Sequence, residues 1–199
     1  ATVTGSMRKA FEFGAEWAEE HGVPVVFNLS YGIDSGLEGT AGIEGFLDEL
    51  LVEHPHLVVV TSAGNSGPGL STVGIPAAAD HVIAVASYFT EELASSLRGR
   101  TVGGGNRVVY YSSRGGEVDK PDVAAPGLAF STIARWDQRP VKSGTSMASP
   151  EVAGAVALLL SAAEAEGLTP TFDDVRRSLW ASANWIDGYT ALDQGYGLI

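Results

Sequence analysis

Val23-Pro-Val-Val-Phe-Asn-Leu-Ser30 is a mostly apolar run of strand length that lies between two segments with helical periodicity. The first segment runs from Ser6, an expected N-cap, to Gly22, an expected helix stop. The second ends before His54-Pro55-His56, and another apolar run, Leu57-Val-Val-Val-Thr61, follows. The order helix, strand, helix, strand predicts an α/β domain.

The rest of the chain continues this alternation. Further strands are predicted at Val82-Ile-Ala-Val-Ala86, from Val108 to Tyr111 and from Phe130 to Ala134. Continuous apolar strands are typical of a sheet that is covered on both faces. We therefore expect a three-layer fold, with a mostly parallel sheet and helices on both faces.

Two later helices complete the prediction. The stretch from Thr145 to Ala165 is apolar nearly all round, which predicts a buried central helix. Thr171 with Asp174 resembles a capping box that opens a last short helix through Leu179.

Composition limits the classes of function. The 199 residues are 45% hydrophobic and fit one domain over residues 1–199, and a net charge of −12 argues against binding of nucleic acid. Cysteine is absent, which excludes disulfides and thiolate chemistry. The longest uncharged apolar run, Val152 to Ala163, is shorter than the roughly 20 residues of a membrane span, so none is expected.

Two stretches carry the residue types of acyl transfer. Ser143-Gly-Thr-Ser-Met-Ala-Ser-Pro150 places Ser146 between a glycine turn and small residues at the start of a predicted helix, where free N–H groups and the helix dipole favour negative charge. Val60-Thr-Ser-Ala-Gly-Asn-Ser-Gly-Pro-Gly69 ends a strand in a glycine-rich loop whose Asn65 amide can donate a hydrogen bond to an oxyanion.

Two further segments, Phe27-Asn-Leu-Ser-Tyr-Gly32 and Lys120-Pro-Asp-Val-Ala-Ala-Pro-Gly127, accompany them. In this order the four segments resemble the subtilisin-like serine peptidases, or subtilases. The Gly-Thr-Ser-Met-Ala-Ser-Pro block is similar to the nucleophile signature of that family, and Ala191-Leu-Asp-Gln-Gly-Tyr-Gly197 to the end of its catalytic domain.

The resemblance implies roles for three of these segments in hydrolysis of a polypeptide substrate. Ser146 is the nucleophile, and Asn65 forms the oxyanion hole with the Ser146 N–H. Ser30-Tyr31-Gly32 pairs with an extended substrate as one wall of the S1 cleft, and Ser62-Ala63-Gly64 is the opposite wall. Tyr31 stands where many members carry leucine, so we expect narrower or more polar subsites.

The aspartate and histidine of the family's triad have no convincing counterpart. Asp34-Ser35-Gly36 has the letters of the aspartate turn but follows the substrate strand, so we do not assign it. None of the histidines is assigned as the base. His21 is interpreted as a helix cap and His81 as a loop residue, and His54 with His56 could chelate a metal, for which two ligands alone are weak evidence.

We therefore expect the chain to be the C-terminal part of a subtilase catalytic domain, nearly inactive alone, with a complementary N-terminal segment that carries Asp and His. The alternative is an inactive subtilase-like module for peptide binding or scaffolding. An esterase of another α/β fold is disfavoured because the Gly-x-Ser-x-Gly elbow is absent. The chemistry needs no cofactor, no metal ligands are assigned although many relatives bind structural calcium, and secretion is the family-level expectation.

Overall fold

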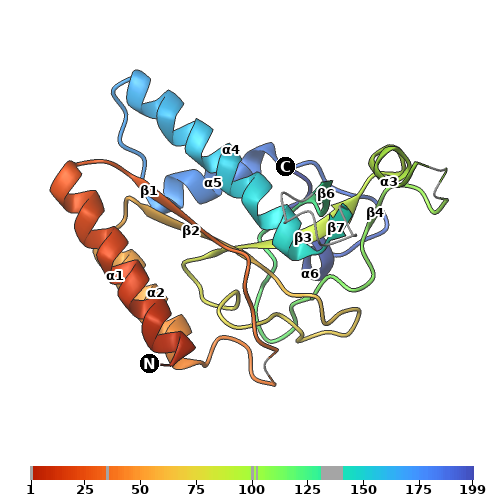
Figure 1. The fold of residues 1–199 in the computed structure, drawn as a ribbon, viewed down its shortest axis with the longest axis horizontal. Coiled ribbons are helices and arrows are strands. Elements are labelled where there is room, and N and C mark those ends of the chain that lie inside the picture. Colours follow the sequence, from red (N-terminus) through yellow and green to blue (C-terminus); the bar gives the residue numbers. More distant parts are fainter. Residues whose placement is uncertain (1, 35, 100, 102, 131–140) are drawn as a thin grey trace, which may run out of the picture.

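The computed structural model describes residues 2–34, 36–99, 101, 103–130 and 141–199. Its main sheet is five-stranded, with β1, β2, β3 and β5 mutually parallel in that order and β4 antiparallel to the end of β3 (Figure 1). The strands are β1 (Val25–Leu29), β2 (Leu57–Ser62), β3 (Ile83–Phe89), β4 (Arg107–Val108) and β5 (Val123–Pro126).

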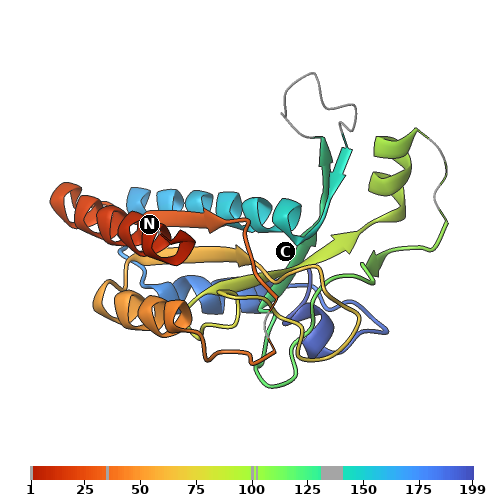
Figure 2. The same ribbon diagram turned by 60° about the horizontal axis from the view of Figure 1, so that its bottom comes forward.

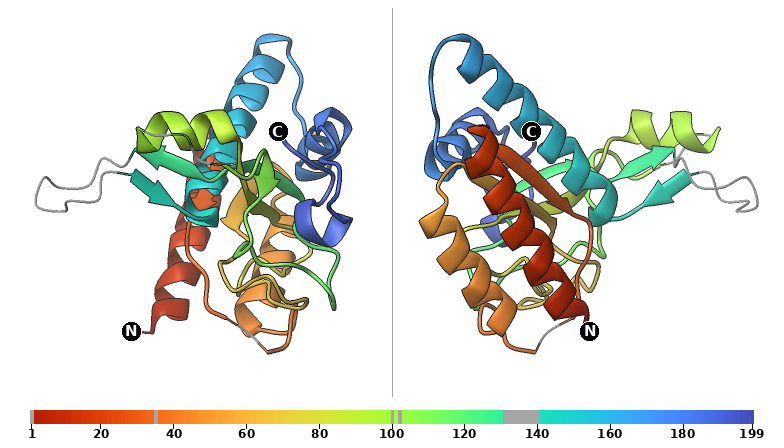
Figure 3. Two further views of the ribbon diagram at one scale, coloured as in Figure 1. Left: turned by 90° about the vertical axis from the view of Figure 1, so that its right-hand side faces the viewer. Right: turned by 60° about the vertical axis from the view of Figure 1, so that its left-hand side comes forward.

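Helices cover both faces of this sheet, which confirms the expected three-layer α/β fold. The helices are α1 (Val3–His21), α2 (Gly42–Glu53), α3 (Glu91–Arg98), α4 (Thr145–Ala165), α5 (Phe172–Ser182) and α6 (Ala191–Gln194). Helices α1 and α2 pack side by side on one face, and α4 lies on the other with α5 (Figure 3).

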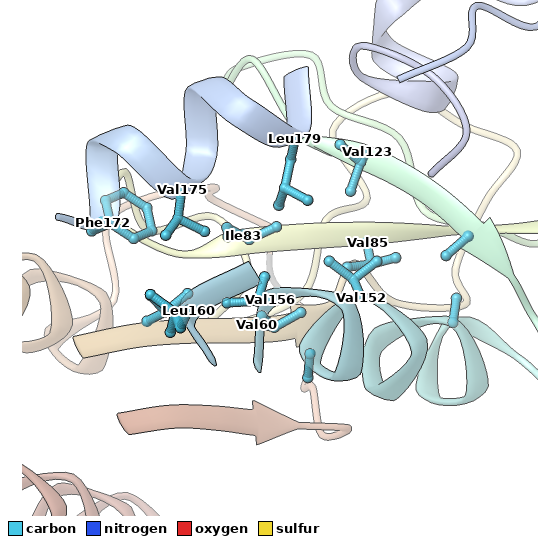
Figure 4. Packing of buried hydrophobic residues seen from close by; sticks show 14 residues of the cluster. Val60, Ile83, Val85, Val123, Val152, Val156, Leu160, Phe172, Val175 and Leu179 are labelled. Carbon is cyan, nitrogen blue, oxygen red and sulfur yellow. The ribbon is translucent and has the colours of Figure 1, made fainter. Parts of the chain in front are cut away.

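The alternation of side chains along β2 explains the two cores. Leu57 and Val59 point toward α1 and α2, whereas Val58 and Val60 point toward α4 and α5. All four are at most 1% exposed, so β2 is a central strand, and these first four positions are all apolar. Figure 4 shows the second core, in which Val152 and Val156 of α4 pack on β2 and β3 while α5 packs above β3.

The end of α2 before His54 agrees with the sequence, whereas α5 runs to Ser182, beyond the expected end at Leu179, and α3 and α6 were not predicted. The first N-cap also differs. That cap is Thr2, whose hydroxyl accepts from Gly5 N, and not Ser6, whereas Gly22 ends α1 in the left-handed conformation as expected. The capping box of Thr171 and Asp174 opens α5.

Several strands differ from the prediction. The strand expected from Val108 to Tyr111 is reduced to β4, and the strand expected from Phe130 to Ala134 lies outside the described residues beyond Phe130. Before that point, β6 (Leu128–Phe130) pairs antiparallel with β7 (Val141–Ser143). This ribbon and α3 stand away from the sheet (Figure 2).

Helix α4 has the predicted bounds but is not buried all round. Its inner face fills the core with Val152, Val156 and Leu160, whereas its outer face exposes apolar residues that include Leu158, which is 74% exposed. In the described part of the chain, α4 is the one helix that is long and apolar enough to span a membrane by length and composition. In its most apolar 18-residue stretch, 28% is buried inside the structure. Because its inner face packs on four strands of the sheet, we interpret α4 as a core helix.

Candidate active site

The predicted site residues meet at the carboxyl edge of the parallel sheet. Ser30 follows β1, Gly64 and Asn65 follow β2, and the first turn of α4 lies between these two strand ends. The carboxyl ends of parallel strands are where α/β folds bind ligands, because the loops there converge on one edge. The fold thus brings together segments that lie more than 100 residues apart in the sequence, such as those of Ser30 and Ser146.

Asn65 is anchored through its amide oxygen. Asn65 Oδ1 accepts hydrogen bonds from Thr145 N at 3.1 Å and from Thr145 Oγ1 at 3.2 Å. A backbone N–H can only donate, so the oxygen must face Thr145 and the Nδ2 group must face elsewhere. No described residue accepts a hydrogen bond from Asn65 Nδ2, which leaves both of its protons available to a ligand.

Thr145 fixes the distance between the β2 loop and α4. It is fully buried, and its hydroxyl lies 3.2 Å from both the N and the O of Gly64. The preceding residue, Gly144, has φ 151°, and a Cβ there would lie 3.3 Å from Asn65 Oδ1. The positive φ favours glycine at this position, and an added Cβ would press on the Asn65 amide.

Ser146 is the second residue of α4 and is partly buried. Its N–H belongs to the first turn, where N–H groups have no acceptor within the helix. Among the described residues, none accepts a hydrogen bond from this N–H, and none bonds to the Ser146 hydroxyl. The N–H, the hydroxyl and the Asn65 amide are therefore free groups beside one helix N-terminus, whose dipole favours negative charge.

A chain of side-chain hydrogen bonds holds β1 against this turn. Ser149 Oγ donates to Asn28 Oδ1 at 2.7 Å, and Asn28 Nδ2 donates to Ser30 Oγ at 3.1 Å. Ser30 Oγ in turn donates to Ser146 O at 2.9 Å. The sequence did not indicate Asn28 or Ser149, although Asn28 is the one polar residue within an otherwise apolar strand.

A third segment joins the two predicted walls. Gly74 N donates to Ala63 O at 3.0 Å, while Ile75 exchanges backbone hydrogen bonds of 2.8 and 3.0 Å with Ile33. Residues 73–75 thus connect the segment after β2 to the segment after β1. Beyond them, Ser66 Oγ donates to Asp34 Oδ1 at 2.5 Å. Asp34 is therefore bonded to the β2 loop, in agreement with leaving it unassigned as a triad member.

All four histidines lie at the opposite edge of the sheet. His21 precedes β1, His54 and His56 precede β2, and His81 precedes β3. These strands are parallel, so residues before them are separated from the carboxyl edge by the strand length, about 16 Å for a five-residue strand.

Each histidine also has a local partner. His54 Nδ1 lies 2.9 Å from Glu19 Oε1, and His81 Nδ1 lies 3.2 Å from Asp48 Oδ1. The Nδ1 atoms of His21 and His56 contact the carbonyl oxygens of Trp17 and Pro170, respectively. No three His, Asp or Glu residues within the described ranges are grouped to hold a metal ion.

The Lys120–Gly127 segment positions β5 and contributes no free group to the site. Lys120 Nζ donates to Asp122 Oδ2 at 2.8 Å and to Val82 O at 2.7 Å, and both side chains are nearly buried. Asp122 Oδ2 also accepts from Ala84 N, which ties the start of β5 to β3. Asp122 is therefore half of a buried ion pair.

Comparisons with known proteins show which family the chain resembles. The model of the Subtilase family matches residues 8–198. Pyrolysin of Pyrococcus furiosus is 35% identical over 220 residues, which cover 98% of this chain and 16% of pyrolysin. Tripeptidyl-peptidase 2 of Arabidopsis thaliana is 37% identical over 169 residues, which cover 81% of this chain and 12% of that protein.

Among solved structures, sphericase superposes with a TM-score of 0.74 at 26% identity, over 100% of this chain and 64% of sphericase. The chain thus spans a small part of the two curated relatives and less than two thirds of the sphericase chain.

Proposed function

The chain belongs to the subtilase family of serine peptidases, and we propose that it supplies the nucleophile and the oxyanion hole of an endopeptidase. Ser146 Oγ attacks the carbonyl carbon of a peptide bond and transfers its proton to a histidine base. The C–N bond then breaks as the amine leaves with a proton from that histidine, and water hydrolyses the acyl-enzyme on Ser146. No metal or cofactor takes part in these steps.

The orientation of the Asn65 amide is the main support for this proposal. The oxygen of the Asn65 amide is held by Thr145, so the Nδ2 group points away from that contact beside the first turn of α4. Asn65 Nδ2 and the Ser146 N–H can therefore donate together to the carbonyl oxygen as it becomes negatively charged. Donors that are fixed before the reaction stabilise this charge without reorganisation.

The substrate binds as an extended strand along Ser30-Tyr31-Gly32 in this proposal, with Ser62-Ala63-Gly64 on its other side. Tyr31 is 38% exposed, and Ser30 and Gly32 are also exposed, so this segment is accessible to a second strand. The hydrogen bond from Ser30 to Ser146 O fixes the distance between that strand and the nucleophile.

The histidine and aspartate come, in this proposal, from a segment outside these 199 residues. Three observations support it. The four histidines of the chain are at the wrong edge of the sheet, no described strand pairs with the outer edge of β1, and the outer face of α4 exposes Leu158. A complementary segment would cover the free edge and the apolar face together.

Labelling by a fluorophosphonate probe in the full-length, matured protein tests the proposal. We expect one labelled serine, loss of the label in Ser146→Ala, and retention of it in Ser161→Ala, which removes an exposed hydroxyl from the same helix. A full-length protein that is folded and never labelled would overturn the peptidase proposal. It would favour the inactive peptide-binding or scaffold module, whose coding sequence should also lack the His-Gly-Thr-His and Asp-Ser/Thr-Gly blocks.

A further inference from the structure

Asp34 lies between the two segments that contact the substrate in the proposed mechanism, on which the following inference rests. It comes four residues after Ser30, and its carboxylate accepts the 2.5 Å hydrogen bond from Ser66, the residue after Asn65. An O–H···O⁻ bond of this length is a strong, charge-assisted contact. The carboxylate is thereby held at one place although Asp34 itself is exposed.

The other oxygen of this carboxylate is unoccupied by any described donor, and no described cation pairs with Asp34. The cation attached to the same loop, Arg114, donates from Nη1 to Pro68 O at 3.0 Å. Its Nε lies 2.6 Å from Asp193 Oδ1, so its charge is already compensated. The surroundings of Asp34 therefore retain a net negative charge.

Covalent geometry limits the distance from this carboxylate to the oxyanion hole. Because Ser66 adjoins Asn65, Asp34 Oδ1 lies within about 12 Å of Asn65 Nδ2. When the carbonyl oxygen of the scissile peptide bond binds Asn65, the side chain of the same substrate residue can extend over a distance comparable to this limit. A lysine stem spans about 6 Å from Cα to Nζ, and arginine spans slightly more.

The polypeptide around Asp34 is fixed by the backbone pairs that hold the third segment. Ile33 exchanges two hydrogen bonds with Ile75, and Gly74 is bonded to Ala63. A Cβ at Gly74 would lie 3.2 Å from Ile33 O, so this approach of the two backbones depends on glycine. The carboxylate thus follows a segment that is connected to both proposed walls.

We infer that Asp34 is a specificity-determining residue, which selects a lysine or arginine immediately before the scissile bond. Its free oxygen would accept a charge-assisted hydrogen bond from the ammonium or guanidinium group. The apolar and neutral residues of the walls provide no other charge for this side chain, and Ser66 holds the acceptor in place.

The test uses the full-length protein and two peptides that differ only in the residue before the scissile bond, lysine or norleucine. Norleucine has a similar apolar stem and no charge. We expect kcat/KM to be about 5-fold higher for the lysine peptide, the upper range for a solvent-exposed ion pair. Asp34→Asn, which keeps the acceptor for Ser66, should remove this preference and leave the norleucine value within about 2-fold.

Two controls separate this effect from the general negative charge. Asp187→Asn makes the same change in net charge on an exposed C-terminal loop and should retain the preference. Asp34→Lys should favour a glutamate peptide over norleucine. In the wild type, raising NaCl from about 0.05 to about 0.5 M should reduce the preference for the lysine peptide. This control does not depend on whether a variant folds.

The possible results distinguish this inference from the proposed function. Cleavage of the norleucine peptide with no preference for lysine, or a preference that Asp34→Asn leaves unchanged, overturns the role of Asp34 alone. Failure of the folded wild-type protein to cleave either peptide overturns the proposed peptidase and this inference with it.

Discussion

The two polar atoms of the Asn65 amide have different functions. Its oxygen anchors the loop after β2 to α4, and its nitrogen is the group that we propose to bind the oxyanion. Stability and catalysis should therefore respond differently to substitutions that change one atom. Ser146 provides the second donor from a backbone group, which no substitution of its side chain removes.

For Asn65 we predict a large loss of turnover with a small change in KM. Asn65→Ala should lower kcat about 100- to 1000-fold, a size taken over from the corresponding donor of subtilisin, a member of this family. Asn65→Asp keeps the acceptor for Thr145, so it should unfold at nearly the wild-type denaturant concentration and still lose the activity. Steady-state kinetics with denaturation curves measure both, and activity retained in Asn65→Ala would contradict the assignment.

At the scale of elements, α2 carries a buried acid in its first turn. Glu44 is 1% exposed, its Oε2 accepts from Ala41 N at 2.8 Å, and its Oε1 has no partner among the described residues. Burial raises the pKa of this carboxyl, and the nearby charges of Asp48 and Glu38 raise it further. Asp48 is itself paired with His81.

This environment predicts a pH-dependent stability. A raised pKa in the folded state means that the contribution of Glu44 is complete below its ordinary value of 4.5 and is lost as the pH rises through the raised value. Glu44→Gln, which keeps an acceptor for Ala41, should therefore increase the free energy of unfolding at pH 8 and increase it by less at pH 5.5. Urea denaturation at both pH values measures this.

Glu49→Gln, an exposed change on the same helix, is the matched control and should show no such difference. A stabilisation by Glu44→Gln that is equal at both pH values would contradict the charge argument.

Elements with a strong local pattern were predictable from the sequence, and those defined by distant partners were not. Helix α4 has the expected bounds, which its small residues determine locally. The capping box of Thr171 and Asp174 opens α5 at the expected place. Strand β5 was not expected, since its place depends on the pair Lys120–Asp122 and on pairing with β3. The free outer face of α4 was missed because periodicity cannot tell which neighbours are present.

The candidate site shows the same division. Asn65 and Ser146 were identified from their motifs, whereas the contacts of Asn28, Ser149 and Asp34 became visible only in the folded chain. Each of these contacts joins segments far apart in the sequence, such as Asn28 with Ser149 or Asp34 with Ser66. Single polar residues carry no local signal that predicts their partners.

At the scale of the whole molecule, the described residues leave one edge of β1 unpaired and one apolar face of α4 exposed. For the 199-residue chain produced alone, we predict self-association, because β1 offers free backbone groups and α4 offers Leu158. Leu158→Glu should reduce the association by weakening the apolar contact, whereas Leu168→Glu, also at an exposed leucine but beyond the end of α4, should have less effect. Analytical ultracentrifugation measures the difference.

A chain that is monomeric and cooperatively folded at micromolar concentration would contradict the incomplete sheet that this prediction assumes.

We propose that this chain holds the nucleophile and the oxyanion hole and receives its base from another segment. The most direct measurement is fluorophosphonate labelling of Ser146, read by mass spectrometry, before and after mixing the chain with the separately produced upstream segment. The account predicts almost no label on the chain alone, because loss of the triad histidine costs roughly a millionfold in subtilisin. It predicts strong labelling of Ser146 after mixing, and none when the histidine of the added segment is replaced by alanine. Equal labelling of the chain with and without that segment would contradict the account.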